Sequence, residues 1–417
     1  MRAARSPLDA DLAQRTLAVV MAGGNGTRLG DLTRWHCKPA LPFGGQYRNI
    51  DFPLSNCINS GIRRVALATQ YKAHSLIQHV QLGWSFLRPE VGEFVEVWPA
   101  QQRCGKGWYA GTADAIRQNL DLVDAHAPDY VLILAGDHVY KMDYLAMIEA
   151  HAASRARVTV GCVEVPIELA SSFGVMQSDR TGRVTGFDEK PLMPRGTPGN
   201  PDVALASMGI YVFDKAHLFE CLSRDGASLG SGHDFGHDVL PALIDAGGVF
   251  AYPFRDPRTA RQGYWRDVGT TASYWEANMD LLDEPPPLDL HDPAWPLWTH
   301  QPQLPPPLFT GAGTALRSIV SPGCRIGGRV ERGVLSQGCT VGPGAVVEEA
   351  VLHANVSIGR DCRVHHAIVE GGCSIPDGCV VGPDSFDEIA AAASGETSVA
   401  LVTQAVIDEL ESRRKVA

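Results

Sequence analysis

The feature that most restricts the fold is a regular spacing of short aliphatic residues near the end of the chain. Between about residues 319 and 384, a branched aliphatic residue is followed directly by glycine or proline at Ile326, Val341, Ile358, Ile375 and Val381. The steps from Val341 to Ile358 and from Ile358 to Ile375 are both 17 residues, close to three six-residue sides. This spacing predicts a hexapeptide-repeat, left-handed parallel β-helix, whose stacked coils turn aliphatic and small side chains inward.

Five of the ten cysteines fall within this repeat. Each stands two residues before a branched aliphatic residue, at Cys324, Cys339, Cys362, Cys373 and Cys379. Residues two apart in a strand point to the same side, so we predict small buried packing residues in a reducing compartment. No C-x-x-C pair occurs, and the 14 histidines show no metal-ligand spacing;.

Upstream of the repeat, from about residue 17 to 282, strand-like segments alternate with helix-like ones. Strands are predicted at 17–22, 63–69, 130–136, 157–165 and 208–213;. Helical spacing occurs between them, for example at 113–123 and 144–153. The alternation predicts an α/β, Rossmann-like and mostly parallel sheet covered by helices, with ligands at the carboxyl ends of strands.

A proline-rich stretch separates the two regions. Residues 283–309 read DEPPPLDLHDPAWPLWTHQPQLPPPLF, which continues neither a helix nor a central strand;. We expect Trp295 and Trp298 within it to pack on a domain surface. The expected parts are an N-terminal extension (1–16), an α/β catalytic domain (17–282), a proline-rich linker (283–312), and a β-helix domain with a C-terminal tail (313–417).

Composition excludes several classes of partner. The net charge of −11 argues against a generic nucleic-acid binder or a protein of anionic membrane surfaces;. No stretch approaches the ~20 apolar residues that cross a bilayer, and the first residues lack the apolar region of a secretory signal;. We therefore expect a cytoplasmic protein with neither nucleic-acid nor membrane partners.

The first segment that carries chemistry follows the strand predicted at 17–22. Its sequence, GGNGTRL (23–29), is neither a Walker A motif nor G-x-G-x-x-G;. Glycines after a strand still let backbone N–H groups approach phosphate closely, and Arg28 adds a forked donor. Taken alone, the segment is also compatible with a tight glycine turn that carries a surface arginine.

Two acids are candidates for a metal site. Asp137 follows the strand predicted at 130–136, and Asp267 lies in the segment GYWRDVGT (263–270). A hard cation such as Mg²⁺ is bound by a few protein oxygens together with oxygens of the substrate phosphates. Two acids on separate segments can therefore form a Mg²⁺ site without a histidine. The alternative for Asp137 is a cap on the helix that follows it.

Further polar clusters are spread along the α/β region. FDEKP (187–191) joins Glu189, an acceptor for sugar hydroxyls, to Lys190, a cation for phosphate. Hydroxyls, an acid, amides and aromatic rings occur in PAQQR (99–103), WYAGTADA (108–115), ASMGIY (206–211) and GHDFGHD (232–238). No G-x-S-x-G or Cys–His signature of an activated nucleophile is present. The mixture indicates phosphoryl-type chemistry run by positioning and charge.

Together these segments resemble the bacterial ADP-glucose pyrophosphorylases (glucose-1-phosphate adenylyltransferases) within the nucleotidyl-sugar pyrophosphorylase family. The resemblance covers roughly residues 17–384 and rests on these stretches, in order: MAGGNGTRL, KPAL, FGGQYRNIDFPLSNCINSGI, TQYKAHSL, PAQQR, WYAGTADA, ILAGDHVYKMDY, FGVM, EKP, ASMGIYVF, HDFGHDVLP and YWRDVGT. The wider family shares only the glycine loop, a Gly-Asp pair and Glu-Lys-Pro, so the longer stretches are specific to the ADP-glucose branch.

The resemblance implies a nucleotidyltransferase that uses Mg²⁺. Glucose 1-phosphate would attack the α-phosphate of ATP in line, releasing diphosphate and ADP-glucose for glycogen synthesis. The implied catalytic residues are Arg28, Lys38, Asp137 and Lys190, and the implied metal ligands are Asp137 and Asp267. The residues implied around ATP are Gly23, Gly24, Gln70, Gln101, Gln102, Tyr109 and Gly111. Those implied around glucose 1-phosphate are Glu189, Lys190, Ser207, Tyr211 and Asp234.

The resemblance also implies a homotetramer regulated by small-molecule effectors bound between the catalytic and β-helix domains. The chain departs from the family at this point. Members often carry arginine at the position of Asn25 and a basic run just before Ala-Lys-Pro, where this chain has Arg34, Trp35, His36 and Cys37. A neutral aromatic side chain cannot replace Arg or Lys at an anionic effector. Our hypothesis is that effector choice or sensitivity is altered.

Three alternatives remain open from the sequence. One is a pyrophosphorylase that uses UTP or dTTP. Another is a non-catalytic regulatory subunit, which would have lost catalytic or metal-binding residues that are all present here. The third is a β-helix acyltransferase with a catalytic histidine in the solenoid, but we expect His353, His365 and His366 at solvent-facing turns.

The effector hypothesis predicts weak activation by sugar phosphates, because the segment from Arg34 to Cys37 offers them fewer cations. Initial rates measured while each effector is titrated would test it. Activation at the strength usual for the family would contradict it.

Overall fold

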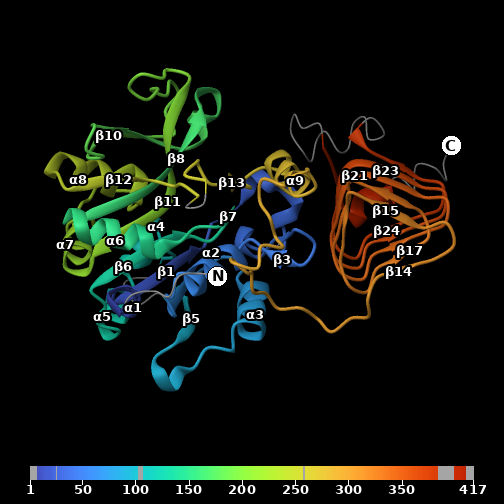
Figure 1. Cartoon of the computed structure of the whole chain (residues 1–417), viewed down its shortest axis with the longest axis horizontal. Coiled ribbons are helices and arrows are strands. Elements are labelled where there is room, and N and C mark those ends of the chain that lie inside the picture. Colours follow the sequence, from blue (N-terminus) through green and yellow to red (C-terminus); the bar gives the residue numbers. More distant parts are fainter. Residues whose placement is uncertain (1–6, 25, 102–106, 257–258, 384–398, 410–417) are drawn as a thin grey trace.

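The computed structural model describes residues 7–24, 26–101, 107–256, 259–383 and 399–409. An α/β body and a solenoid of short strands lie side by side, with helix α9 (Thr271–Asp280) between them (Figure 1). No helix within the described residues has the length and apolar character needed to cross a membrane.

A nine-stranded sheet forms the centre of the α/β body. Its strands are β1 (Thr16–Ala22), β4 (Arg64–Thr69), β5 (Phe94–Pro99), β6 (Tyr130–Ala135), β8 (Val158–Pro166), β9 (Gly174–Ser178), β10 (Val184–Glu189), β11 (Val203–Asp214) and β12 (Val249–Pro253). Strands β6, β1, β4 and β5 lie in that order and are all parallel. Strand β11 pairs antiparallel with β8 along one edge, and along its other edge with β9 and then β6, also antiparallel. The predicted α/β class with a parallel centre is confirmed.

Helices pack on both faces of this sheet because the buried side chains of β1 alternate. Ala18 and Val20 belong to one apolar cluster, with residues of α2, α3 and α6, whereas Leu17 and Val19 belong to another, with residues of α4, α7 and α8;. The helices are α1 (Pro7–Gln14), α2 (Asp51–Asn59), α3 (His74–Gly83), α4 (Thr112–Arg117), α5 (Leu120–Ala125), α6 (Tyr144–Ser154), α7 (Lys215–Gly226) and α8 (Leu240–Ala246).

The helix predicted at 113–123 is interrupted. It forms as two pieces, α4 and α5, with Asn119 in a non-helical conformation between them. The Asn119 amide donates hydrogen bonds to the Ala115 carbonyl (2.8 Å) and to the Tyr109 hydroxyl (3.0 Å). Asparagine side chains that bond locally compete with helical geometry, which explains the break.

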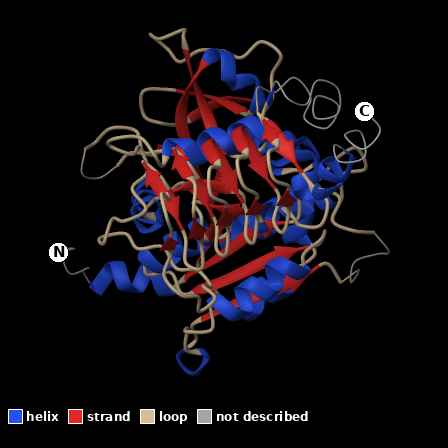
Figure 2. Cartoon of the chain, turned by 90° about the vertical axis from the view of Figure 1, so that its right-hand side faces the viewer, coloured by secondary structure: helices blue, strands red, loops and turns tan. Residues whose placement is uncertain are grey.

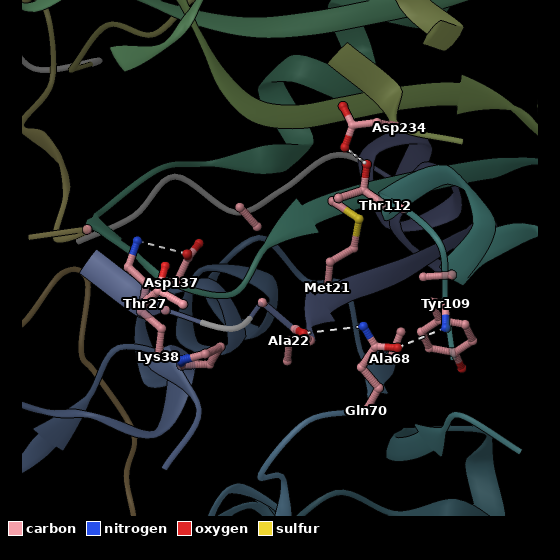
Figure 3. Close-up of a pocket in the computed structure, with 18 of the residues that line it drawn as sticks. Met21, Ala22, Thr27, Lys38, Ala68, Gln70, Tyr109, Thr112, Asp137 and Asp234 are labelled. Carbon is pink, nitrogen blue, oxygen red and sulfur yellow. Dashed lines mark hydrogen bonds and ion pairs between the residues drawn. The ribbon is translucent and has the colours of Figure 1, made fainter. Parts of the chain in front are cut away.

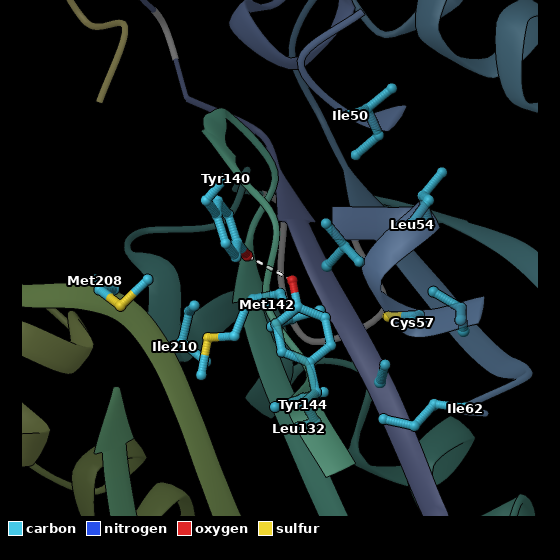
Figure 4. Packing of buried hydrophobic residues seen from close by; sticks show 14 of the residues in the cluster. Ile50, Leu54, Cys57, Ile62, Leu132, Tyr140, Met142, Tyr144, Met208 and Ile210 are labelled. Atoms are coloured by element: carbon cyan, nitrogen blue, oxygen red, sulfur yellow. Dashed lines mark hydrogen bonds between the residues drawn. The ribbon is translucent and has the colours of Figure 1, made fainter. Parts of the chain in front are cut away.

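A short ribbon next to the sheet has β7 (His138–Tyr140) paired antiparallel with β13 (Trp265–Asp267). Helix α2 fixes its end, because the Asn56 side chain donates to the Tyr140 carbonyl (3.1 Å) and accepts from the Met142 N–H (3.2 Å). The hydroxyls of Tyr140 and Tyr144 meet inside the apolar cluster (Figure 4). The ribbon is therefore held rigidly beside the carboxyl end of β6.

The solenoid consists of short strands in parallel register. One sheet contains β14 (Leu308–Phe309), β17 (Arg325–Ile326), β20 (Thr340–Val341), β22 (Ser357–Ile358) and β24 (Ser374–Ile375). The other contains β15 (Thr314–Leu316), β16 (Ile319–Val320), β18 (Arg329–Glu331), β19 (Val334–Leu335), β21 (Val346–Leu352), β23 (Arg363–Val369), β25 (Val380–Val381) and β26 (Ala400–Val402). Viewed from the solenoid end of the molecule, these strands lie side by side (Figure 2). The predicted parallel β-helix is confirmed.

The repeat positions form the inner core of this β-helix. Val341 pairs with Ile358, which pairs with Ile375, and all three side chains are buried. Cys324, Cys339, Cys362 and Cys373 are buried in the same cluster, as predicted, and the half-buried Cys379 packs against it. Inward aliphatic and thiol side chains therefore stack from coil to coil.

The linker and α9 attach the β-helix to the α/β body. Trp295 donates its indole N–H to Asn56 (2.8 Å), and the Trp298 side chain packs against the core that includes α2, so both tryptophans pack as expected. Tyr274 of α9 bonds with the His353 ring (2.9 Å), and Trp275 donates to the Glu349 carbonyl (2.8 Å). The solvent-facing position expected for His353 is wrong, because α9 covers that turn and buries the ring.

Replacing Ile358 by alanine should destabilise the β-helix by about 2–5 kcal/mol, because a buried side chain between two coils is lost. Val380→Ala is the matched control, since that side chain is exposed and its loss should cost about 0.5 kcal/mol or less;. Urea unfolding followed by circular dichroism measures both. Equal midpoints for the two variants would contradict the inward stacking.

Candidate active site

A cavity of about 570 Å³ lies at the carboxyl ends of β1, β4 and β6 (Figure 3). In open α/β sheets this edge is the usual place for a ligand. The predicted site residues that line it are Gly23, Gly24, Arg28, Lys38, Gln70, Tyr109, Gly111, Asp137 and Asp234. One cavity thus collects side chains from widely separated segments.

The glycine-rich turn forms one wall of the cavity. It leaves β1 at Gly23 and enters a short 3-10 helix, η1 (Thr27–Thr33), through Gly26. Gly26 has a φ of 60°, and a Cβ there would lie 2.9 Å from the Thr33 methyl, so glycine is required;. Asn25 lies outside the described residues. The turn exposes backbone and the Arg28 side chain to the cavity, as a phosphate-binding wall requires.

Gln70 and Tyr109 form a second wall (Figure 3). The Gln70 amide accepts from the Tyr109 N–H (2.9 Å) and donates to the Gly23 carbonyl (3.4 Å). The Tyr109 hydroxyl accepts from Asn119 (3.0 Å). Gln101 is exposed and is not part of the described cavity lining, and Gln102 lies outside the described residues. This wall presents an amide and an aromatic ring held by hydrogen bonds.

Asp137 and Asp267 meet because β7 pairs with β13. The register places Asp267 opposite His138, next to Asp137, which ends the turn after β6. Among the described residues, Asp137, His138 and Asp267 form the one group of three whose donor atoms lie within 4.8 Å of one another. The predicted pair of acids is therefore one cluster in space.

The ammonium group of Lys38 lies between the two carboxylates. Its Nζ is 2.8 Å from Asp137 Oδ2 and 2.5 Å from Asp267 Oδ1, and the side chain is buried. Burial acts to raise the pKa of Asp137, but the positive charges of Lys38 and His138 outweigh it and keep that pKa well below its usual range;. Burial likewise acts to lower the pKa of Lys38, but the two carboxylates raise it. Asp137 and Lys38 are therefore both charged at neutral pH.

His138 was missed by the sequence analysis. Its Nε2 is 3.6 Å from Asp137 Oδ1 and 3.9 Å from Asp267 Oδ1, and its ring meets the edge of Trp265. Nδ1 is buried without a hydrogen-bond partner in the described structure. The only local signal was its position directly after Asp137, and strand alternation alone would have turned it away from that residue.

The loop from Ser231 to Asp234 closes the cavity on the side of α4. Asp234 accepts from the Thr112 hydroxyl (2.9 Å) and from the N–H groups of Gly236 (2.9 Å) and His237 (3.1 Å). Asp225 on α7 accepts from the Ser231 hydroxyl (2.5 Å) and the His233 ring (2.7 Å). The loop is therefore anchored from both ends of its short span.

The other residues predicted to bind glucose 1-phosphate are all within the described part of the chain, and they do not line the cavity. Glu189 ends β10 and forms an ion pair (3.1 Å) with Lys190, which follows the strand and is largely exposed. The Glu189 carboxylate packs close to Gly236, which joins it to the loop of Asp234. Ser207 accepts from the Gly209 N–H (3.3 Å), and the Tyr211 ring is buried against Phe235.

The segment from Arg34 to Cys37 faces the β-helix domain. Trp35 is exposed beneath the Arg34 guanidinium, which lies 5.4 Å from its ring centroid. Burial raises the pKa of Glu370 on the β-helix. The negative charge of Asp31 raises this pKa further, and the positive charge of Arg34 lowers it. Asp31 and Arg34 therefore lie near Glu370, at the junction of the two domains. Burial and the charge of Arg48 lower the pKa of His36, so His36 adds no full positive charge near pH 7.

Two families match the two parts of the chain. The nucleotidyl transferase family matches residues 17–284, and the GlmU-like C-terminal hexapeptide family matches residues 309–402. The chain is 53% identical over 380 residues to the glucose-1-phosphate adenylyltransferase of Hydrogenovibrio crunogenus, covering 90% of each protein. It is 50% identical over 416 residues to that of Paraburkholderia phymatum, covering 97% of this chain and 98% of the relative. It is 51% identical over 404 residues to that of Paramagnetospirillum magneticum, covering 94% of each.

Replacing Gly111 by alanine should weaken binding of ATP, the ligand that the sequence resemblance assigns to this cavity. The new Cβ would lie 2.3 Å from the His233 carbonyl oxygen, so the loop of Asp234 would have to move. Overpacking of this kind costs about 1–3 kcal/mol, or roughly 5- to 150-fold in affinity.

Gly107→Ala is the matched control, because nothing lies within 4 Å of a Cβ at that position. Isothermal titration calorimetry with ATP compares the two variants. If both bound ATP as the unchanged protein does, the close approach at Gly111 would have no role in the site.

Proposed function

We propose, since this chain belongs to the nucleotidyl transferase family and to its group of glucose-1-phosphate adenylyltransferases, that it converts ATP and α-D-glucose 1-phosphate into ADP-glucose and diphosphate. The ADP-glucose would supply α-glucan (glycogen) synthesis. The observation that carries this proposal is one cavity at the carboxyl edge of a parallel sheet, lined by a glycine turn, two cations and Asp137, with Asp267 paired to Lys38 beside it.

ATP would lie along the walls that meet at β1. The turn at Gly23 and Gly24 would receive the phosphates, because its backbone can approach them closely;. Gln70, Tyr109 and Gly111 would enclose the base, with the amide of Gln70 already oriented by the Tyr109 N–H. Gln101 and Gln102 stay candidates from the resemblance alone.

The reaction needs position and charge more than a nucleophile from the protein. A phosphate oxygen of glucose 1-phosphate is itself the nucleophile once the repulsion between its charge and the triphosphate is screened. Arg28 would stabilise the charge that develops on the departing diphosphate, and Lys38 would bind phosphate oxygens near it. The in-line displacement then proceeds without a covalent intermediate on the enzyme.

The donor set fits a divalent metal ion. Asp137 and Asp267 would hold Mg²⁺, since they offer carboxylate oxygens from two segments within 4.8 Å of each other and already attract one cation;. When bound, Mg²⁺ would supply positive charge that neutralises phosphate oxygens and polarises them for displacement. His138 lies beside these oxygens and is a further candidate ligand.

Glucose 1-phosphate would enter between the Asp234 loop and the end of β10. Lys190 would pair with its phosphate, because its side chain is exposed next to Glu189. Glu189, Ser207, Tyr211 and Asp234 would face the sugar hydroxyls. The bonds that already hold Asp234 would be shared with the sugar or exchanged for it.

We further propose a homotetramer with an effector site near the junction of the two domains. The junction combines the segment from Arg34 to Cys37 with α9 and the β-helix. An uncharged indole and a neutral imidazole there support an effector preference that differs from that of relatives with a basic run.

A nucleotide panel tests the proposal. With glucose 1-phosphate, the protein should form the nucleotide-sugar fastest from ATP, measured by chromatography of the product and by diphosphate release. Best turnover with UTP or dTTP would contradict the assignment of the base.

Asp137→Asn is the control that separates an enzyme from a regulatory subunit. It should lower kcat at least about 100-fold, as does the loss of a group that stabilises charge in the transition state. Its circular dichroism spectrum should be unchanged. A normal rate in this variant would remove Asp137 from the metal site.

A further inference from the structure

Lys38 occupies the space between two acids that the proposed reaction assigns to a metal ion. The Nζ atom forms close ion pairs with both, and the side chain is almost fully buried. Its backbone is fixed as well, because the Asn49 amide donates to the Lys38 carbonyl (3.1 Å) and the Ile50 N–H donates to the Pro39 carbonyl (2.9 Å). The ammonium group therefore acts as a counter-ion built into the site.

An ammonium group and a divalent ion cannot share this position. Mg²⁺ binds its oxygen ligands at about 2.0–2.1 Å. The oxygens that would bind it here, Asp137 Oδ2 and Asp267 Oδ1, are in contact with Lys38 Nζ. Two positive groups in contact with the same carboxylates would also repel each other strongly in a partly buried site. The metal ion can enter only as Nζ leaves.

The cavity itself indicates where Nζ can go. Lys38 lines the same cavity as Gly23, Gly24 and Arg28, where the triphosphate would lie. A lysine side chain has four methylene groups, so its charged end can move while the backbone stays fixed. Phosphate oxygens next to the carboxylates offer the ammonium group an equivalent partner.

We propose that in the free enzyme the Lys38 ammonium group occupies the metal position between Asp137 and Asp267. When ATP binds, this group moves to the phosphate oxygens, and the metal ion enters with the nucleotide. This inference rests on the proposed function. It assigns to one lysine two successive partners, the carboxylate pair first and the triphosphate second. The exchange keeps both carboxylates neutralised at every stage.

Binding of Mn²⁺ to the nucleotide-free protein tests the exchange without any turnover. Electron paramagnetic resonance counts free Mn²⁺ and so gives its affinity. Lys38→Met should bind Mn²⁺ at least about tenfold more tightly than the unchanged protein, because the position between the carboxylates is vacated.

Arg28→Met is the matched control for a general charge effect. Arg28 lines the same cavity but forms no ion pair with either carboxylate in the described structure. Its removal should change Mn²⁺ affinity by about twofold or less, well below the tenfold change expected at Lys38. Equal gains in the two variants, or no gain in Lys38→Met, would overturn the proposal.

A second measurement keeps the test decisive if Lys38→Met does not fold. Crystals of the unchanged protein with Mn²⁺ alone should show no anomalous peak between Asp137 and Asp267. Crystals with Mn²⁺ and the unreactive α,β-methylene analogue of ATP should show the peak, with Nζ moved to phosphate oxygen. A peak between the acids while Nζ still contacts both would overturn the proposal.

These outcomes are separate from failure of the proposed function. ADP-glucose formation is measured on the same preparations of unchanged protein. A protein that forms ADP-glucose but binds Mn²⁺ beside an unmoved Lys38 contradicts the exchange alone. A protein that forms none contradicts the proposed function, whatever its Mn²⁺ affinity.

Discussion

The antiparallel pairing of β7 with β13 is the contact on which the candidate site depends. These are short strands, yet their register sets Asp267 opposite His138 and so next to Asp137. Two carboxylates at this distance repel each other unless a cation lies between them, and Lys38 supplies that cation;. Asn56 of α2 forms hydrogen bonds at the far end of the ribbon. The packing of α2 in the core therefore helps to set the geometry of the site.

The segment that carries Asp267 also carries the attachment of the β-helix. Directly after β13, Thr270 caps α9 through reciprocal hydrogen bonds with Ser273;. One turn later, Tyr274 and Trp275 contact the turns of the β-helix at His353 and Glu349. The site and the domain junction therefore lie at the two ends of one short, rigid element. Asp31 and Arg34 also lie close enough to Glu370 of the β-helix to affect its pKa, so their segment approaches the same junction.

Much of the fold was predictable because its signals are local. The strands at 17–22, 63–69 and 130–136 were recognised from apolar runs, and the structure begins and ends them within a residue of those limits. The repeat of Val341, Ile358 and Ile375 was recognised from spacing alone, since every coil must present a small or aliphatic side chain inward;. The break at Asn119 was not recognised, because its hydrogen bond to Tyr109 is invisible in helical periodicity.

The site was predictable in its residue types and much less so in its geometry. Glycines, cations and acids could be named from motifs, and most of them meet in one cavity. The position of His138 could not, because it depends on a partner strand far away in the sequence. The burial of His353 could not either, since it requires α9 to lie against that turn.

By itself, the sequence determined the two architectures, the kinds of side chain available for chemistry and the family to which the chain belongs, since periodicity and motif order are properties of neighbouring residues. Only the tertiary structure decided which of those side chains face one another. Distances such as that from Lys38 Nζ to Asp267 Oδ1 are set by register and packing between segments that no local pattern relates. For that reason the lysine first assigned to phosphates is found between the two acids.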